Sequence, residues 1–68
     1  MRTITGKELC RILEKKGWAL KTVHGSHHVY IKEGRKERIS VPVHGNKDLK
    51  SGLLKAIMKL ADVEEGEL

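Results

Sequence analysis

Residues 18–43 read WALKTVHGSHHVYIKEGRKERISVPV, in which apolar residues alternate with others in three short segments. The segments span 18–24, 27–32 and 38–43, and the runs 25–26 and 33–36 between them are rich in turn formers. Short strands joined by turns of two to four residues are typical of an antiparallel meander. Pro42 has no backbone N–H to donate, which predicts that this end of the third strand lies at an edge or at the strand's exit.

The alternation also predicts which sheet face each side chain takes. In the first strand it places one set of residues opposite another, namely Trp18, Leu20 and Thr22 opposite Ala19, Lys21 and Val23. Trp18 begins an apolar alternation, which favours a place in the core over a place on an exposed binding surface. Tyr30 lies opposite Val29 and Ile31, and the pattern leaves burial and contact with a ligand equally open for it.

A capped helix is predicted before the strands. Thr5 and Glu8 have the Thr-x-x-Glu form of a capping box, in which each side chain accepts a hydrogen bond from the other residue's backbone N–H. Leucine and isoleucine follow at helical spacing, and Gly17 ends the helix because glycine enters the left-handed conformation without penalty. We therefore predict a helix over 5–16. Cys10 within it is interpreted as a small buried residue, since nothing near it in the sequence favours a thiolate.

A polar loop at 44–48 leads into a second predicted helix, for which Ser51 is a plausible N-cap. This helix has a broad apolar face made by Leu53, Leu54, Ile57, Met58, Leu60 and Ala61. Two helices with one apolar face each can cover one face of a three-stranded antiparallel sheet, which predicts a two-layer α+β fold. The order α-β-β-β-α is also that of the double-stranded-RNA-binding domain. The acidic tail at 62–68 is predicted to fray.

Length and composition limit the protein class. The 68 residues predict a single domain, 1–68, with a small core. One cysteine excludes an intramolecular disulfide and is typical of a reducing compartment. No apolar run approaches the roughly 20 residues that span a membrane, and the N-terminus lacks the apolar stretch of a signal peptide. We therefore expect a cytoplasmic protein with no membrane partner.

The charge is distributed unevenly along the chain. All 14 Lys and Arg residues, but only five of the nine acidic residues, lie in 1–61, so that part has a formal charge of +9 against +5 for the whole chain. A body this basic attracts polyanions, of which nucleic acid is the commonest. Solubility alone is the alternative explanation for the charge.

Four histidines lie near predicted turns. His24 and His27 flank the turn at 25–26, His28 follows, and His44 opens the loop after the third strand. In a meander the end of the third strand can approach the start of the second, so His44 is placed near this turn if the register permits. A metal site needs three or four ligands, and no flanking acid or nearby cysteine completes one, so no metal is predicted.

Metal-free RNA cleavage is a second interpretation of these histidines. An imidazole can remove the proton of a ribose 2′-hydroxyl near neutral pH, and the oxygen then attacks its own phosphodiester. Cations stabilise charge on the phosphate, and the sequence offers Lys21, Lys32, Lys47 and Lys50 for this role. Histidines also occur at turns as ordinary polar residues, and the residues by themselves leave both interpretations open.

The segments GSHHVY at 25–30 and ISVPVHGNKDLKSGLLKAI at 39–57 resemble the HicA family of toxins, and the helix closed by Gly17 and Trp18 fits as well. The resemblance covers nearly the whole chain. It implies the fold of a double-stranded-RNA-binding domain, in agreement with the predicted order of elements. It also implies a ribosome-independent messenger-RNA interferase that arrests growth and pairs with a HicB-like antitoxin. The histidine chemistry described above needs no cofactor, and none is expected.

The resemblance assigns roles to individual residues. The family's catalytic histidine directly follows Gly-Ser, which makes it His27 here. Gly25 is expected to make the turn that presents this histidine, and Ser26 to orient the turn or contact a phosphate. The histidine of the Val-Pro-x-His segment maps to His44, with a supporting role in binding or charge stabilisation. His28 inherits no role, because the residue at that position varies among members.

Two other functions compete with RNA cleavage. A non-catalytic double-stranded-RNA-binding module would use a lysine-rich start of the last helix, of which Lys47, Lys50 and Lys55 are a thin version. A module that binds an acidic protein would show no salt-sensitive affinity for RNA.

The chain departs from the family where Asp62 replaces a frequent glycine, which leaves the end of the second helix open.

Overall fold

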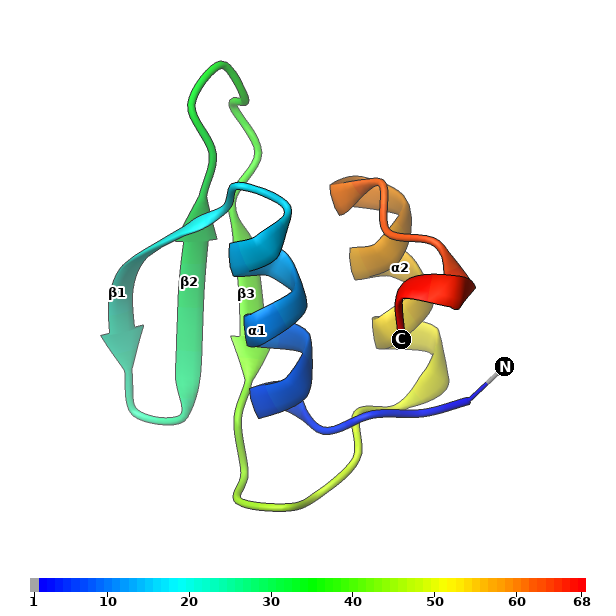
Figure 1. The fold of residues 1–68 in the computed structure, drawn as a ribbon. Coiled ribbons are helices and arrows are strands. Elements are labelled where there is room, and N and C mark those ends of the chain that lie inside the picture. The colour runs from blue at the N-terminus through cyan, green and yellow to red at the C-terminus, as the bar shows by residue number, and fades with distance from the viewer. Residues whose placement is uncertain (1) are drawn as a thin grey trace.

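The computed structural model describes residues 2–68 and has the predicted order of helices and strands (Figure 1). Its elements are α1 (Gly6–Lys15), β1 (Ala19–His24), β2 (His27–Ile31), β3 (Ile39–Pro42), α2 (Ser51–Ala61) and a short 3-10 helix, η1 (Glu65–Glu67). The strands form one antiparallel sheet in the order β1-β2-β3. The predicted α+β class and the meander are therefore confirmed. Within residues 2–68, no helix has both the length and the apolar character to cross a membrane.

Both ends of α1 form as predicted. The Thr5 hydroxyl accepts a hydrogen bond from the Glu8 N–H at 3.2 Å, and the Thr5 N–H donates to the Glu8 carboxylate at 3.1 Å. At the other end Gly17 takes a φ of +96°. This left-handed residue lets the Trp18 N–H donate to the Leu13 carbonyl at 2.9 Å, which closes the helix. The helix bounds thus follow from local sequence.

Replacing Thr5 by alanine is expected to lower the free energy of unfolding by about 1 kcal/mol, because the Glu8 N–H loses its side-chain acceptor. In a domain of this size the melting temperature falls by roughly 4–8 °C for that loss. Thr5→Ser keeps the hydroxyl and is expected to unfold like wild type. Urea unfolding followed by circular dichroism measures both variants. An alanine variant as stable as wild type would show that the cap contributes nothing.

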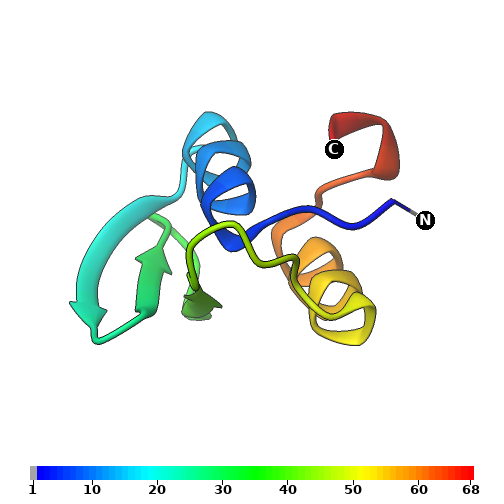
Figure 2. The ribbon, with the colours of Figure 1, turned by 90° about the horizontal axis from the view of Figure 1, so that it is seen from below.

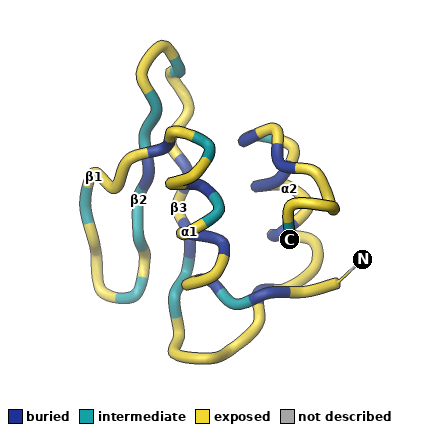
Figure 3. Tube along the Cα trace, viewed as in Figure 1, coloured by how far each residue is buried: buried dark blue, intermediate teal, exposed yellow. Residues whose placement is uncertain are grey.

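The helices leave one face of the sheet uncovered. α1 lies across the sheet, and α2 lies beside α1 on the β3 side (Figures 1 and 2). Buried residues concentrate where these three parts meet (Figure 3). The most buried side chains there include Leu9 and Leu13 of α1, Tyr30, Ile39 and Val41 of the sheet, and Leu54 of α2. No element within residues 2–68 covers the opposite face, which is called the open face below.

Both aromatic residues belong to the core. Trp18 is buried, as predicted, and the guanidinium carbon of Arg35 lies 5.6 Å from the centre of its ring. Tyr30 is also buried, and its hydroxyl donates to the Glu14 carboxylate at 2.8 Å. Burial, reinforced by hydrogen bonds, raises the pKa of the Tyr30 phenol far above its ordinary range. Of the two roles left open for Tyr30, the structure supports burial and excludes contact with RNA.

Cys10 is buried on α1. Burial raises the pKa of its thiol, because the charged thiolate loses solvation there. The side chain therefore remains a protonated thiol at neutral pH, which agrees with its interpretation as a small core residue.

A bulge in β1 changes the predicted faces. Lys21 is the extra residue, because its neighbours Leu20 and Thr22 pair with the consecutive residues Tyr30 and Val29. Paired residues share a sheet face, so Leu20 and Thr22 lie on opposite faces. The predicted strict alternation of the first strand is therefore wrong beyond Lys21. No glycine marks this bulge, and local sequence does not reveal it.

The acidic tail packs against the rest of the chain instead of fraying as predicted. α2 ends where Asp62 takes the left-handed conformation with a φ of 57°. The chain then turns back, the Val63 N–H donates to the Met58 carbonyl at 2.9 Å, and Val63 is buried. Glu67 adds an ion pair of 3.1 Å with Lys16, the C-cap of α1. These are tertiary contacts, which the composition of the tail does not report.

Candidate functional site

The turn between β1 and β2 presents His27 on the open face of the sheet. Gly25 in this turn has a φ of +60°, and an added Cβ would meet no atom within 4 Å. Backbone conformation, and not lack of space, therefore favours glycine there. His27 begins β2 and pairs with His24 of β1 and with Pro42 of β3. These three residues form a row across the open face, and the His27 side chain is exposed.

Ser26 connects this turn to the exit of β3. Its carbonyl accepts a hydrogen bond from the Val43 N–H at 2.7 Å, directly after the pairing of His27 with Pro42. His44 is the next residue and is exposed. The structure thus brings His44 to the same end of the sheet as His27, as the meander predicted.

Ser40 is a neighbour of His27 that sequence reasoning missed. It lies on the open face of β3, and its Oγ is 3.5 Å from the Nδ1 of His27, at the outer limit of a hydrogen bond. Alternation in the third strand already set Ser40 opposite the apolar Ile39 and Val41. The register between β2 and β3, which the sequence does not specify, was the missing information.

His28 lies on the other face of the sheet from His27. It pairs with Val41, a core residue, and is half-buried. His24 is exposed on the open face and pairs directly with His27. Among residues 2–68, no three His, Cys, Asp or Glu side chains are grouped so as to hold a metal ion.

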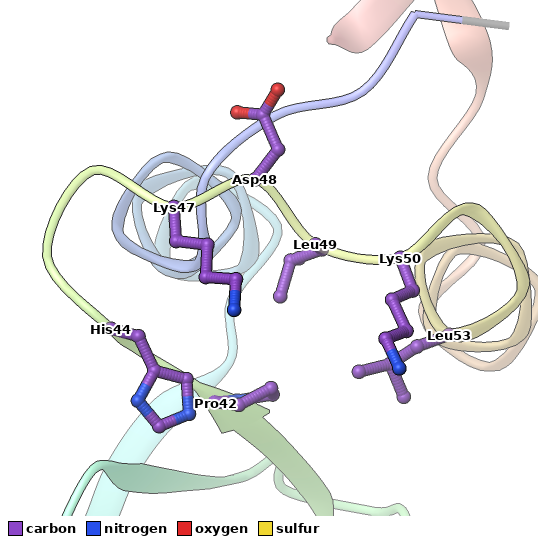
Figure 4. Close-up of a pocket in the computed structure, with 7 residues that line it drawn as sticks. All are labelled: Pro42, His44, Lys47, Asp48, Leu49, Lys50 and Leu53. Atoms are coloured by element: carbon purple, nitrogen blue, oxygen red, sulfur yellow. The ribbon is translucent and has the colours of Figure 1, made fainter.

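A cavity of about 300 Å³ lies between the exit of β3 and the start of α2 (Figure 4). Its lining comprises the apolar residues Pro42, Leu49 and Leu53, the basic residues His44, Lys47 and Lys50, and Asp48. The Asp48 carboxylate points away from the other side chains and accepts a hydrogen bond from the Thr3 hydroxyl at 3.0 Å. Because this carboxylate points away, Lys47 and Lys50 dominate the charge around the cavity. Pro42 lines the cavity and is also the strand partner of His27, so the cavity adjoins His27.

The structure separates the four lysines named from the sequence. Lys47 and Lys50 line the cavity. Lys32 follows the far end of β2, five residues or about 17 Å of strand from His27. Its ammonium lies 6.0 Å from the centre of the Trp18 ring. Lys21 is the exposed extra residue of the β1 bulge and does not line the cavity.

Comparison with known proteins agrees with the arrangement of these elements. The profile of a family described as the HicA toxin of bacterial toxin–antitoxin systems matches residues 6–63. A chain of a solved structure described as the "HicA3 and HicB3 toxin-antitoxin complex" is 35% identical in sequence and superposes with a TM-score of 0.67. That match covers 87% of this chain and 94% of the other. No curated protein sequence shows a comparable match.

Proposed function

Since the chain belongs to the HicA toxin family, we propose that it is the RNA-cleaving toxin of a cytoplasmic toxin–antitoxin pair, with His27 as its catalytic residue. The observation that carries the proposal is the position of His27. It is exposed at the turn end of the open face, and its partner Pro42 belongs to a cavity lined by Lys47 and Lys50.

The proposed reaction is an internal transesterification of RNA. His27 accepts the proton of a 2′-hydroxyl, and that oxygen bonds to the adjacent phosphorus. The bond from phosphorus to the 5′-oxygen breaks, and this oxygen takes up a proton from the solvent. The products are a 2′,3′-cyclic phosphate and a free 5′-hydroxyl. No water attacks the phosphorus and no metal enters the step, and DNA is not a substrate because it lacks the attacking hydroxyl.

Neighbouring residues support this role for His27. Ser40 faces Nδ1 of the imidazole at 3.5 Å, which leaves Nε2 for the substrate. Lys47 and Lys50, with His44 beside them, attract the phosphates of the RNA backbone to the end of the sheet that carries His27. Gly25 and Ser26 act through the backbone by shaping the turn and connecting it to β3.

A HicB-like antitoxin is the proposed protein partner. The similar solved structure is described as a complex of HicA3 with HicB3. An antitoxin seated on the open face of this chain would cover His27 and neutralise nearby lysines. Inhibition is then a matter of access, with no change needed in the fold of the toxin.

Cleavage of a defined RNA in the presence of EDTA tests the proposed function. We expect the RNA to be cut into fragments with cyclic phosphate and 5′-hydroxyl ends, and the matching 2′-O-methyl RNA to be bound but left intact. RNA that is bound and never cut would favour the non-catalytic binding module. Loss of cleavage in EDTA, or fragments with 5′-phosphates, would contradict the metal-free mechanism.

A further inference from the structure

We propose that the cavity between β3 and α2 seats a single nucleotide of the RNA, next to the phosphodiester held at His27. The base of this nucleotide lies on the apolar side of the cavity, and its phosphate lies between Lys47 and Lys50. The inference rests on the proposed function, because it takes RNA as the ligand and places the reacting phosphodiester at His27.

The apolar side of the cavity matches the face of a base. Pro42, Leu49 and Leu53 form it. Leu53 is 39% exposed, although it stands in the first turn of a helix whose other large apolar residues are mostly buried. The other large apolar side chains that are exposed, Leu20 and Val23, both lie on β1. Unstacked bases have apolar faces, and proteins bind them by packing side chains against these faces. Leu53 is therefore exposed where a base can pack against it.

The basic side of the cavity matches a phosphate. Figure 4 shows the ammonium groups of Lys47 and Lys50 on the same side of the loop as Pro42 and His44, whereas the Asp48 carboxylate points the other way. The Thr3 hydroxyl holds that carboxylate outside. The first turn of α2 contains no acidic residue, and the Lys50 side chain does not cap it. The backbone N–H groups of this first turn also attract an anion, in addition to the attraction by the two lysines.

The cavity's size and position select one nucleotide of a single strand. A volume of about 300 Å³ is at the lower end of small-ligand sites, which suits one nucleotide. Pro42 is both part of its lining and the cross-strand partner of His27. A nucleotide on Pro42 therefore adjoins whatever occupies His27, and the cavity positions the scissile bond by holding its neighbour. This predicts that the enzyme cuts where an unpaired base is free to enter.

Fluorescence anisotropy with a short single-stranded 2′-O-methyl RNA tests the nucleotide seat, and a chain of the same length made of abasic units is the second probe. Leu53→Ala is expected to weaken binding of the RNA about five- to tenfold and to leave the abasic chain unaffected. Leu20→Ala, the matched control on β1, is expected to leave both affinities unchanged. Lys47→Ala and Lys50→Ala are each expected to lower the salt dependence of binding, with the slope of log K against log salt falling by about 0.7. Lys59→Ala, at the far end of α2, is the control for them.

The two probes keep this proposal separate from the proposed function. They cannot be cut, so the affinities are measured whether or not the protein is a nuclease. Equal affinity of wild type for the base-bearing and abasic chains would overturn the nucleotide seat. So would a Leu53→Ala variant that binds like Leu20→Ala. In either case RNA cleavage by His27 would still stand on its own assay.

Discussion

Replacing His27 by alanine is expected to slow RNA cleavage by about 10²–10⁴-fold, the usual contribution of a positioned proton acceptor. The side chain is exposed and lies outside the hydrophobic core cluster, so the variant is expected to fold like wild type. Affinity for 2′-O-methyl RNA is expected to persist, because the lysines beside the cavity supply it. Single-turnover cleavage measured alongside anisotropy separates lost chemistry from lost binding.

His28→Ala is the matched control for this experiment. It removes an adjacent imidazole that lies on the opposite face of the sheet, and we expect it to keep wild-type cleavage. His24→Ala removes the direct neighbour of His27 on the open face, and we expect a smaller loss than for His27. Equal cutting by the His27→Ala variant and wild type would contradict the assignment and indicate either another residue or a contaminating nuclease.

Replacing Gly6 by alanine is expected to lower the free energy of unfolding by about 2–3 kcal/mol. A Cβ at this first residue of α1 would overlap the backbone carbonyl of Pro42 and lie 3.2 Å from the Cα of Val43. Backbone cannot rotate away as a side chain does, so α1 must move from the exit of β3. The melting temperature is expected to fall by roughly 10–20 °C, and RNA binding is expected to weaken because Pro42 lines the cavity.

Gly52→Ala gives the opposite sign in the same assay. Gly52 also lies in the first turn of a helix, but a Cβ there meets nothing within 4 Å. Alanine is the better helix former by up to about 1 kcal/mol, so this variant is expected to be as stable as wild type or more stable. Thermal unfolding by circular dichroism compares the two variants. A Gly6→Ala variant as stable as Gly52→Ala would show that α1 is not fitted closely to β3.

Local sequence patterns predicted the helices and strands, but the pairing between strands determines which residues meet at the site. The capping box at Thr5 and the left-handed Gly17 fix α1 from within a few residues. The meander followed from alternation and two turns. Ser40 was missed because its nearness to His27 depends on how β3 pairs with β2. The bulge at Lys21 was missed for the same reason, since only the pairing with β2 reveals the extra residue.

The cavity was beyond the reach of sequence reasoning for a different reason. Lys47 and Lys50 were named as cations in a loop, and Leu53 as part of an apolar helix face. Their convergence with Pro42 depends on how the loop crosses from β3 to α2. Lys32 had equal standing in the sequence, but the length of β2 carries it to the Trp18 end of the sheet. Residue type identified the candidate residues, but only the path of the chain shows which of them lie together at the cavity.

The burial of Val63 has a consequence for how this chain emerges from the ribosome. α1 and the sheet are synthesised first, but their apolar face is closed by Leu54, Ile57 and Met58 of α2 and then by Val63. A nascent chain that stops before these residues leaves its core exposed to water, and Lys50 and Leu53 are not yet held in the wall of the cavity. Folding of α1 and the sheet therefore waits until the ribosome has passed Val63, and the cavity forms in the same step as the core.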